Sequence, residues 1–276
     1  MSQPLSASEL RELLEQARHA VAASGELVRA AWKRPRTIQH KKSPKDLVTE
    51  TDLAVEAMLK ESLGALLPGA GFLGEEGGAE YGTGTSGSEL MWVVDPVDGT
   101  TNFAHGIPFV ATSVALCHRS QPVLGLVNLP ILGELFSAAR GQGAWLDGEA
   151  IHVSPTATLL EAVVATGFPY DIAPHLKTIL RQLELAMPAT QGVRRPGAAA
   201  LDLAYVACGR YDAFFEFALN PWDTAAGILL VQEAGGRVGR MLEEGPYVPG
   251  APDILVSNEA LYPLMRELLS RAARDA

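Results

Sequence analysis

Apolar residues follow a helical period in the first quarter of the chain. Ser6 and Glu9 form a capping-box signature. One apolar stripe follows it: Leu10, Leu13, Leu14, Ala17, Val21, Val28 and Trp32. A second stripe begins after Thr49 and Asp52, which suit the first turn of a helix, and stops at Pro68-Gly69. The pattern therefore predicts two amphipathic helices before residue 70.

Between residues 71 and 153 the apolar residues come in short runs separated by Gly, Pro and Asp-Gly pairs. Such runs are typical of strands. We expect strands at residues 72–73, 91–94, 110–116, 123–127, 135–138 and 151–153. Asp147-Gly148 is a favourable two-residue hairpin turn.

After about residue 155 the two periods alternate. We expect helices at 174–187, 197–208, 222–233 and 259–273, with strands at 163–166, 213–217, 237–238 and 254–256. The pattern therefore predicts an α+β half, residues 1–153, and an α/β half, residues 154–276. This division also fits the length of 276 residues, which is about two domains at ~150 residues each.

Composition narrows the class of protein. Hydrophobic residues make up 47% and charged residues 20%, so the chain can bury a sizeable core. The net charge of −10 makes nucleic acid and anionic lipid poor partners and cations better ones. The sequence contains no apolar run of membrane-spanning length, no signal-peptide pattern, and only 2 cysteines. We therefore expect a cytoplasmic protein without a disulfide framework.

The densest polar segment covers residues 92–103 and reads Trp-Val-Val-Asp-Pro-Val-Asp-Gly-Thr-Thr-Asn-Phe. We expect a buried strand that ends at Asp95 and Pro96, because proline cannot donate to a ladder. A sharp turn at Asp98 and Gly99 would bring two carboxylates together, and like charges repel unless a cation lies between them. The amides of Gly99 and Thr100 would suit a phosphate. The alternative is a solvated turn, but the whole string is more specific than that.

Two other strand or helix ends are acidic. Glu75 and Glu76 follow an apolar strand, and Asp223 opens an apolar helix. Taken singly, the pair Glu75 and Glu76 would only mark the point where a strand passes into a loop. Asp223 alone would be a first-turn carboxylate that faces the helix dipole. Together with the central segment they predict one shared site, and four or more carboxylates indicate hard cations. Three histidines lack zinc-ligand spacing, and we interpret them as surface or core residues: His105, His118 and His152.

Two further segments have a structural and a functional interpretation. Residues 33–46 carry six basic residues and are either an exposed loop or a mobile lid that adds positive potential for phosphate: Lys33, Arg34, Arg36, Lys41, Lys42 and Lys45. Residues 82–87 match G-x-G-x-x-G literally. A dinucleotide site needs a preceding strand and a following helix, which are missing here, so we interpret this segment as a flexible linker.

At these residues the sequence resembles the inositol monophosphatase family of lithium-sensitive, magnesium-dependent phosphatases. The motifs that match span most of the chain: Gly74-Glu75-Glu76, residues 95–103, Pro221-Trp222-Asp223 with Ala225-Ala226-Gly227, residues 43–52, residues 194–203 and Phe214-Phe215-Glu216. The resemblance implies a layered αβαβα sandwich of the sugar-phosphatase type, two or three Mg²⁺ per site, and a homodimer.

The resemblance also implies residue roles. The metal ligands would be the side chains of Glu75, Asp95, Asp98 and Asp223 and the carbonyl of Val97. Thr100, with Glu75 and Asp52, would orient and deprotonate the attacking water. The substrate would meet Gly99, Thr100, Thr101, Glu216 and the turn of Gly197, Ala198 and Ala199. One residue departs from the pattern, because many members carry Ser or Thr where this chain has Ala198.

The sequence therefore predicts a Mg²⁺-dependent phosphomonoesterase of a small polyol phosphate, with inositol 1-phosphate first among its substrates. Fructose 1,6-bisphosphate, histidinol phosphate and adenosine 3′,5′-bisphosphate remain alternatives on the same site. A different class is a non-catalytic regulatory binding protein, and a third is a structural Ca²⁺ protein. The complete acidic set argues against the second class, and the missing D-x-[DN]-x-[DN]-G loop argues against the third.

Overall fold

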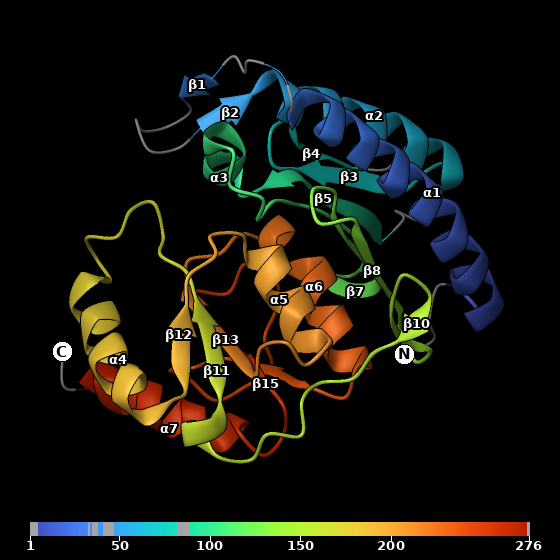
Figure 1. Ribbon diagram of the computed structural model, residues 1–276. Coiled ribbons are helices and arrows are strands. Elements are labelled where there is room, and N and C mark those ends of the chain that lie inside the picture. Colours follow the sequence, from blue (N-terminus) through green and yellow to red (C-terminus); the bar gives the residue numbers. More distant parts are fainter. Residues whose placement is uncertain (1–4, 33, 35–37, 41–46, 82–88, 275–276) are drawn as a thin grey trace.

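The computed structural model describes residues 5–32, 34, 38–40, 47–81 and 89–274. Figure 1 shows helices and sheets stacked in alternating layers. The outer helices on one side are α1 (Ala7–Trp32) and α2 (Glu50–Leu66), the central pair is α5 (Ala199–Ala207) and α6 (Pro221–Glu233), and the outer pair on the other side is α4 (Leu176–Ala189) and α7 (Tyr262–Arg274). A sheet separates each pair of helices from the next, which is the predicted αβαβα sandwich.

The larger sheet has eight strands and the smaller one five. The order in the larger sheet is β10 (Glu149–Ala150), β9 (Gly143–Leu146), β8 (Glu134–Ala139), β7 (Gln121–Leu129), β6 (Ala111–His118), β5 (Leu90–Asp98), β3 (Gly71–Gly74) and β4 (Gly78–Glu80). The order in the smaller sheet is β12 (Gly192–Arg194), β11 (Val163–Thr166), β13 (Ala213–Phe217), β15 (Asp253–Ser257) and β14 (Arg237–Gly239). Two short elements complete the path near the site: β1 (Ile38–His40) paired with β2 (Leu47–Thr49), and the helix α3 (Thr100–His105).

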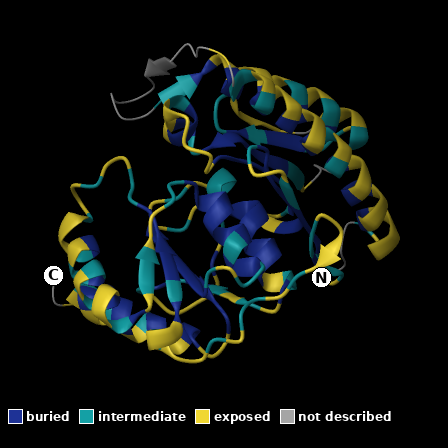
Figure 2. Cartoon of the chain, in the orientation of Figure 1, coloured by how far each residue is buried: buried dark blue, intermediate teal, exposed yellow. Residues whose placement is uncertain are grey.

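Alternation along the strands sorts side chains between the layers. Val94 packs under α1 and α2, whereas its neighbour Val93 faces the central helices. In the smaller sheet Phe214 faces the central helices and Phe215 packs under α4 and α7. This is the period of two that strands impose. The central helices are buried from both sides, as Figure 2 shows, and this explains why α6 is apolar nearly all round.

Two predicted strands differ from the structure. β5 does not end at Asp95 but continues through Pro96 to Asp98, because two residues of β5, Pro96 and Val97, oppose the single residue Thr112 of β6 there. This bulge interrupts the ladder, so the missing proline N–H removes no ladder bond. The predicted strand at 151–153 is wrong: the amide of Val153 donates to the carbonyl of Ala234 at the end of α6, 3.1 Å away, instead of to a strand.

The two sheets come from different parts of the chain, residues 71–150 and 163–257. The core between them includes side chains from both sheets, and the division into halves at residue 153 stays a prediction. Of the two ambiguous segments, residues 82–87 lie outside the described residues, and the basic segment is described only at Arg34 and 38–40. No helix in the described part of the chain has the length and apolar character needed to cross a membrane.

Candidate active site

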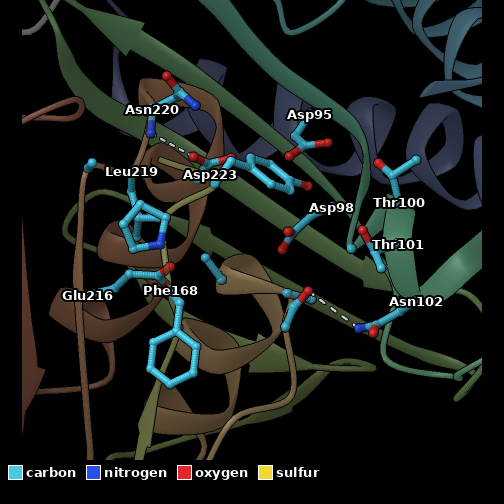
Figure 3. Close-up of a pocket in the computed structure, with 18 of the residues that line it drawn as sticks. Asp95, Asp98, Thr100, Thr101, Asn102, Phe168, Glu216, Leu219, Asn220 and Asp223 are labelled. Carbon is cyan, nitrogen blue, oxygen red and sulfur yellow. Dashed lines mark hydrogen bonds between the residues drawn. The ribbon is translucent and has the colours of Figure 1, made fainter. Parts of the chain in front are cut away.

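The three acidic segments meet in one cavity of about 400 Å³. Its wall comes from the ends of β3 and β5, the start of α3, the turn before α5, β13 and the start of α6. Figure 3 shows Asp95, Asp98 and Asp223 directed toward the same space. Twelve of the predicted residues line it: Glu75, Asp95, Val97, Asp98, Gly99, Thr100, Thr101, Gly197, Ala198, Ala199, Glu216 and Asp223. Asp52 is the one predicted site residue that lies behind the wall.

The β5–α3 connection sets the position of the two central aspartates. Asp95 accepts a hydrogen bond from the amide of Val97, 3.0 Å away, which folds the bulge around its carboxylate. Asp98 accepts from the amide of Ala200, 2.7 Å away, and so caps the start of α5 from another element. This bond supplies a cap that Ala198, the N-cap residue, cannot supply with its methyl group. Asp98 therefore ties the central motif to the turn on the far side of the cavity.

Gly99 makes the turn between β5 and α3 and has a φ of 86°, a left-handed conformation that favours glycine. A Cβ at this position would lie 2.8 Å from the carbonyl oxygen of Phe109. The glycine is therefore required by space as well as by backbone angle. Asn102, which the sequence interpretation missed, secures the same region because its side-chain amide donates to the carbonyls of Phe109, at 2.8 Å, and Pro196, at 2.9 Å.

Asp52 supports Thr100 from behind the cavity wall. Thr49 caps α2, and Asp52 at the third helical position returns the capping box by accepting from the amide of Thr49 at 3.0 Å. Its other carboxylate oxygen lies 3.2 Å from the hydroxyl of Thr100. That hydroxyl also lies 3.0 Å from the carbonyl of Val97, and its single proton is donated to one of the two at a time. Asp52 is fully buried, so its contact with the site passes through Thr100.

Glu56 is a second supporting residue that the sequence interpretation missed. It accepts from the amides of Glu76 and Gly77, at 2.9 and 2.7 Å, and so holds the loop that presents Glu75. The signal was present in the sequence, because Asp52 and Glu56 are four residues apart and share one helix face. Two acids on the inner face of an otherwise amphipathic helix need buried donors.

Asp223 and Glu216 form the wall opposite α3. Asp223 accepts from the amide of Asn220, 2.6 Å away, and the side chain of Asn220 completes a capping box for α6. Glu216 lies on β13 and is buried. Its carboxylate packs so closely on Gly167 that a Cβ there would come within 2.1 Å of it.

Burial and mutual repulsion dominate the electrostatics of the cavity. Burial, and after it the charge of Glu75, raises the pKa of Asp98 to about 7 against the opposing bond from Ala200. Burial and the charge of Asp98 raise the pKa of Asp223 to about 8. The pKa of Asp95 is also raised well above its usual range, by burial and then by Glu75 and the other acids. In the absence of a cation, protonation of these carboxylates relieves the repulsion.

The donor set fits a hard divalent cation. It consists of buried carboxylate oxygens beside a backbone carbonyl, without thiolate or imidazole. The carboxylates are not in a metal-binding arrangement, because no three acidic, histidine or cysteine groups of the described residues converge to hold an ion. Asp98 and Asp223 instead accept bonds from backbone amides, and the carboxyl of Asp95 hydrogen-bonds that of Glu75. Cation binding would replace this carboxyl–carboxyl contact.

Comparison with known proteins agrees with the geometry. A profile of the inositol monophosphatase family matches residues 9–275. The chain belongs to the inositol monophosphatase family. This confirms the resemblance noted in the sequence, and with relatives named inositol-1-monophosphatase it identifies the chain as a phosphatase. Family members are in general metal-dependent.

Individual relatives cover nearly the whole chain. The inositol-1-monophosphatase of Caulobacter vibrioides is 43% identical over 234 residues, 84% of this chain and 90% of that protein. The Nus factor SuhB of Pseudomonas aeruginosa is 42% identical over 250 residues, 87% of this chain and 92% of that protein. A solved structure of the extragenic suppressor protein suhB from Bartonella henselae has a TM-score of 0.86 at 38% identity and covers 92% of this chain and 96% of its own. These proteins share the fold and the family while carrying different names.

Proposed function

We propose that this inositol monophosphatase family member is a Mg²⁺-dependent phosphomonoesterase that hydrolyses a small polyol phosphate, first of all inositol 1-phosphate. One observation carries the proposal: acids from three distant segments surround a cavity that also contains Thr100 and the start of α3. A volume of about 400 Å³ suits a small molecule rather than a polymer. A buried acidic cluster of this kind repels a phosphate dianion unless cations are bound, so metal binds before or together with the substrate.

The ion ligands in this proposal are the carboxylates of Glu75, Asp95, Asp98 and Asp223 and the carbonyl of Val97, which would hold two or three Mg²⁺. Such ions lower the pKa of a bound water and offset the charge that develops on the leaving oxygen. The protein's part is to keep four carboxylates ionised and close together. The amide bonds to Asp98 and Asp223 serve this purpose, because they favour the charged form of both side chains.

Thr100 orients the attacking water in this mechanism. When its hydroxyl donates to Asp52, the lone pairs of the oxygen remain available to a water in the cavity. Glu75, on the adjacent loop, accepts the proton that the water loses. Asp52 is then a positioning residue, since it fixes the direction of the Thr100 hydroxyl from the buried side.

The substrate spans the cavity between two walls. The phosphate would lie on the amides of Gly99 and Thr100 beside the exposed Thr101, where α3 begins. The alcohol part would face Glu216 and the turn formed by residues 197–199, which also line the cavity. Figure 3 shows Glu216 across the space from Thr100. Ala198 contributes no hydroxyl there, so polyol recognition depends on other side chains of this wall.

A phosphate-release screen tests the proposal. The purified protein is assayed with inositol 1-phosphate, fructose 1,6-bisphosphate, histidinol phosphate, adenosine 3′,5′-bisphosphate and p-nitrophenyl phosphate, with EDTA or Mg²⁺, and with and without Li⁺. We expect Mg²⁺-dependent, Li⁺-inhibited release with the highest kcat/KM for inositol 1-phosphate. A higher kcat/KM for another ester would reassign the substrate. No release from any ester would favour the regulatory binding protein as the alternative.

The proposal includes a cytoplasmic homodimer. Both cysteines are free, as in a reducing compartment. Exposed apolar residues follow one face of α4 at helical spacing: Leu176, Leu180 and Met187, which are 42%, 58% and 59% exposed. A second copy would cover this face. Light scattering should give twice the mass of 29.3 kDa, and Leu180→Glu should reduce it to the monomer value. A monomer for the unmodified chain would contradict the dimer.

A further inference from the structure

Arg195 lies at the mouth of the cavity and has no part in the mechanism above. It follows β12 and is exposed. Among the lining residues that the structure describes, it is the only one with a positive charge, opposite five carboxyl groups: Glu75, Asp95, Asp98, Glu216 and Asp223. The partners of this single positive charge therefore decide what Arg195 can do in the cavity.

Packing holds the guanidinium of Arg195 in place. Its Cζ lies 5.3 Å from the centre of the Phe168 ring, a cation–π contact. On the other side it covers Gly197, where a Cβ would come within 2.6 Å of Nη1. Gly197 has a φ of 91°, so the turn is suited to glycine on both counts. Asn102 further holds this turn through the carbonyls of Pro196 and Gly197, at 2.9 and 3.3 Å.

The N–H groups of Arg195 remain available. Within the described part of the chain, no carboxylate lies at ion-pair distance from it, and its guanidinium donates no hydrogen bond. Arg194, its neighbour, differs because it donates to the backbone carbonyl of Val193 and does not line the cavity. A planar fork of donors that is positioned but unpaired is suited to two adjacent acceptor oxygens.

Two buried acids, Glu216 and Asp202, lie close enough to Arg195 to feel its charge. Burial raises the pKa of both Glu216 and Asp202, and the charge of Arg195 opposes that rise. The guanidinium is thus close enough to act on both acids. The mouth therefore offers hydrogen-bond donors from Arg195 beside the carboxyl group of Glu216, a combination that suits hydroxyl groups because they both accept and donate.

We propose that Arg195 is a substrate-binding residue that, with Glu216, hydrogen-bonds adjacent hydroxyl groups of the alcohol part, while Phe168 contacts its C–H face. This inference rests on the proposed function and narrows its substrate class. It selects phosphate esters of a polyhydroxylated ring over esters that carry a second phosphate. Arg195 also takes over, from a different position in the turn, the polyol contact that Ala198 lacks a hydroxyl to make.

Kinetics of three variants test the proposal: Arg195→Ala, Arg195→Lys and the matched control Arg194→Ala. The substrates are inositol 1-phosphate, fructose 1,6-bisphosphate and p-nitrophenyl phosphate, which carries no hydroxyl groups. For Arg195→Ala we expect KM for inositol 1-phosphate to rise about 10-fold with kcat within about twofold, the size of a lost charge-assisted bond pair. Arg195→Lys should resemble Arg195→Ala, because lysine keeps the charge but loses the planar fork. Arg194→Ala and all p-nitrophenyl phosphate values should change less than about twofold.

Other results overturn the proposal in distinguishable ways. An unchanged KM for inositol 1-phosphate in Arg195→Ala would show that Arg195 makes no contact with the hydroxyl groups of the substrate. An equal rise for p-nitrophenyl phosphate means that Arg195 attracts the scissile phosphate. If the unmodified protein prefers fructose 1,6-bisphosphate and Arg195→Lys keeps that preference, then Arg195 recognises a second anion. In all three cases the phosphatase proposal survives. Absence of turnover of every ester by the unmodified protein would overturn the proposed function and this inference with it.

Discussion

The two walls of the cavity differ in how firmly they are built. On the wall of β5 and α3, Asp95 is 2% exposed and position 99 accommodates only glycine. Asp52 and Asn102 hold the neighbouring groups by hydrogen bonds. On the wall of β13 and the turn before α5, Arg195 is exposed and is held by stacking and by a glycine surface. The difference teaches that Asp95 and Gly99 are fixed by burial and close packing, whereas the exposed Arg195 on the other wall can change without disturbing the core.

Asp98→Asn should have the largest effect, because it belongs to the rigid wall and to the proposed ion ligands. We expect activity to fall by at least about 10³-fold, since metal-ion assistance contributes several kcal/mol. Asparagine keeps an oxygen for the amide of Ala200, so the melting temperature should stay close to that of the unmodified protein. Activity and thermal melting are measured together, with Glu61→Gln on the exposed face of α2 as the control. Retention of more than a tenth of the activity would contradict the role.

Gly99→Ala tests whether the rigid wall depends on backbone geometry. We expect a loss of stability of about 2–4 kcal/mol and a loss of most activity, because the new methyl would meet the carbonyl of Phe109 in a left-handed turn. Gly106→Ala is a matched control. Gly106 has a similar φ of 73° but no atom within 4 Å of its Cβ position, so it should cost only about 1 kcal/mol. Equal melting temperatures for the two variants would argue against the close approach.

The acids of the cavity predict a pH-dependent stability of the metal-free protein. In the folded protein burial raises the pKa of Asp98 from its ordinary value of 3.8 to about 7. Between these values the folded state holds a proton that the unfolded chain has lost, so stability falls as pH rises through this interval. We expect the melting temperature in EDTA to drop by about 5 °C or more from pH 5.5 to pH 8.5. Mg²⁺ should raise it more at pH 8.5 than at pH 5.5, and an equal rise at both would contradict the cation's role in relieving repulsion.

Phe168→Leu on the other wall should have the smallest effect. Leucine keeps an apolar surface but loses the ring face under Arg195, so we expect KM for inositol 1-phosphate to rise about threefold with unchanged kcat. The melting temperature should shift by less than about 2 °C. Steady-state kinetics of Phe168→Leu, measured under the same conditions as those of Asp98→Asn, compare the two walls directly. A fall in kcat as large as that for Gly99→Ala would mean that the two walls are not different in kind.

Much of this protein was readable from its sequence, because helical and strand periods, caps and the turn at residues 98–99 depend on neighbours within a few positions. The pattern predicted most helices and strands and the central acidic segment, and the family resemblance implied the layers and most of the residues that line the cavity. The prediction of a strand at 151–153 was wrong because it used only the local apolar run. That run gives no information about the hydrogen bond from Val153 to Ala234, which is distant in sequence.

The tertiary structure alone decided which hydrogen bonds and packing contacts hold the site together. It placed Asp52 behind Thr100, Glu56 under the loop of Glu75, and Asp98 at the start of α5. It also brought Arg195 onto Phe168, a contact with no local sequence signature. Such pairs form because the packed layers bring distant segments together, so their partners follow from the assembled core and not from residue spacing.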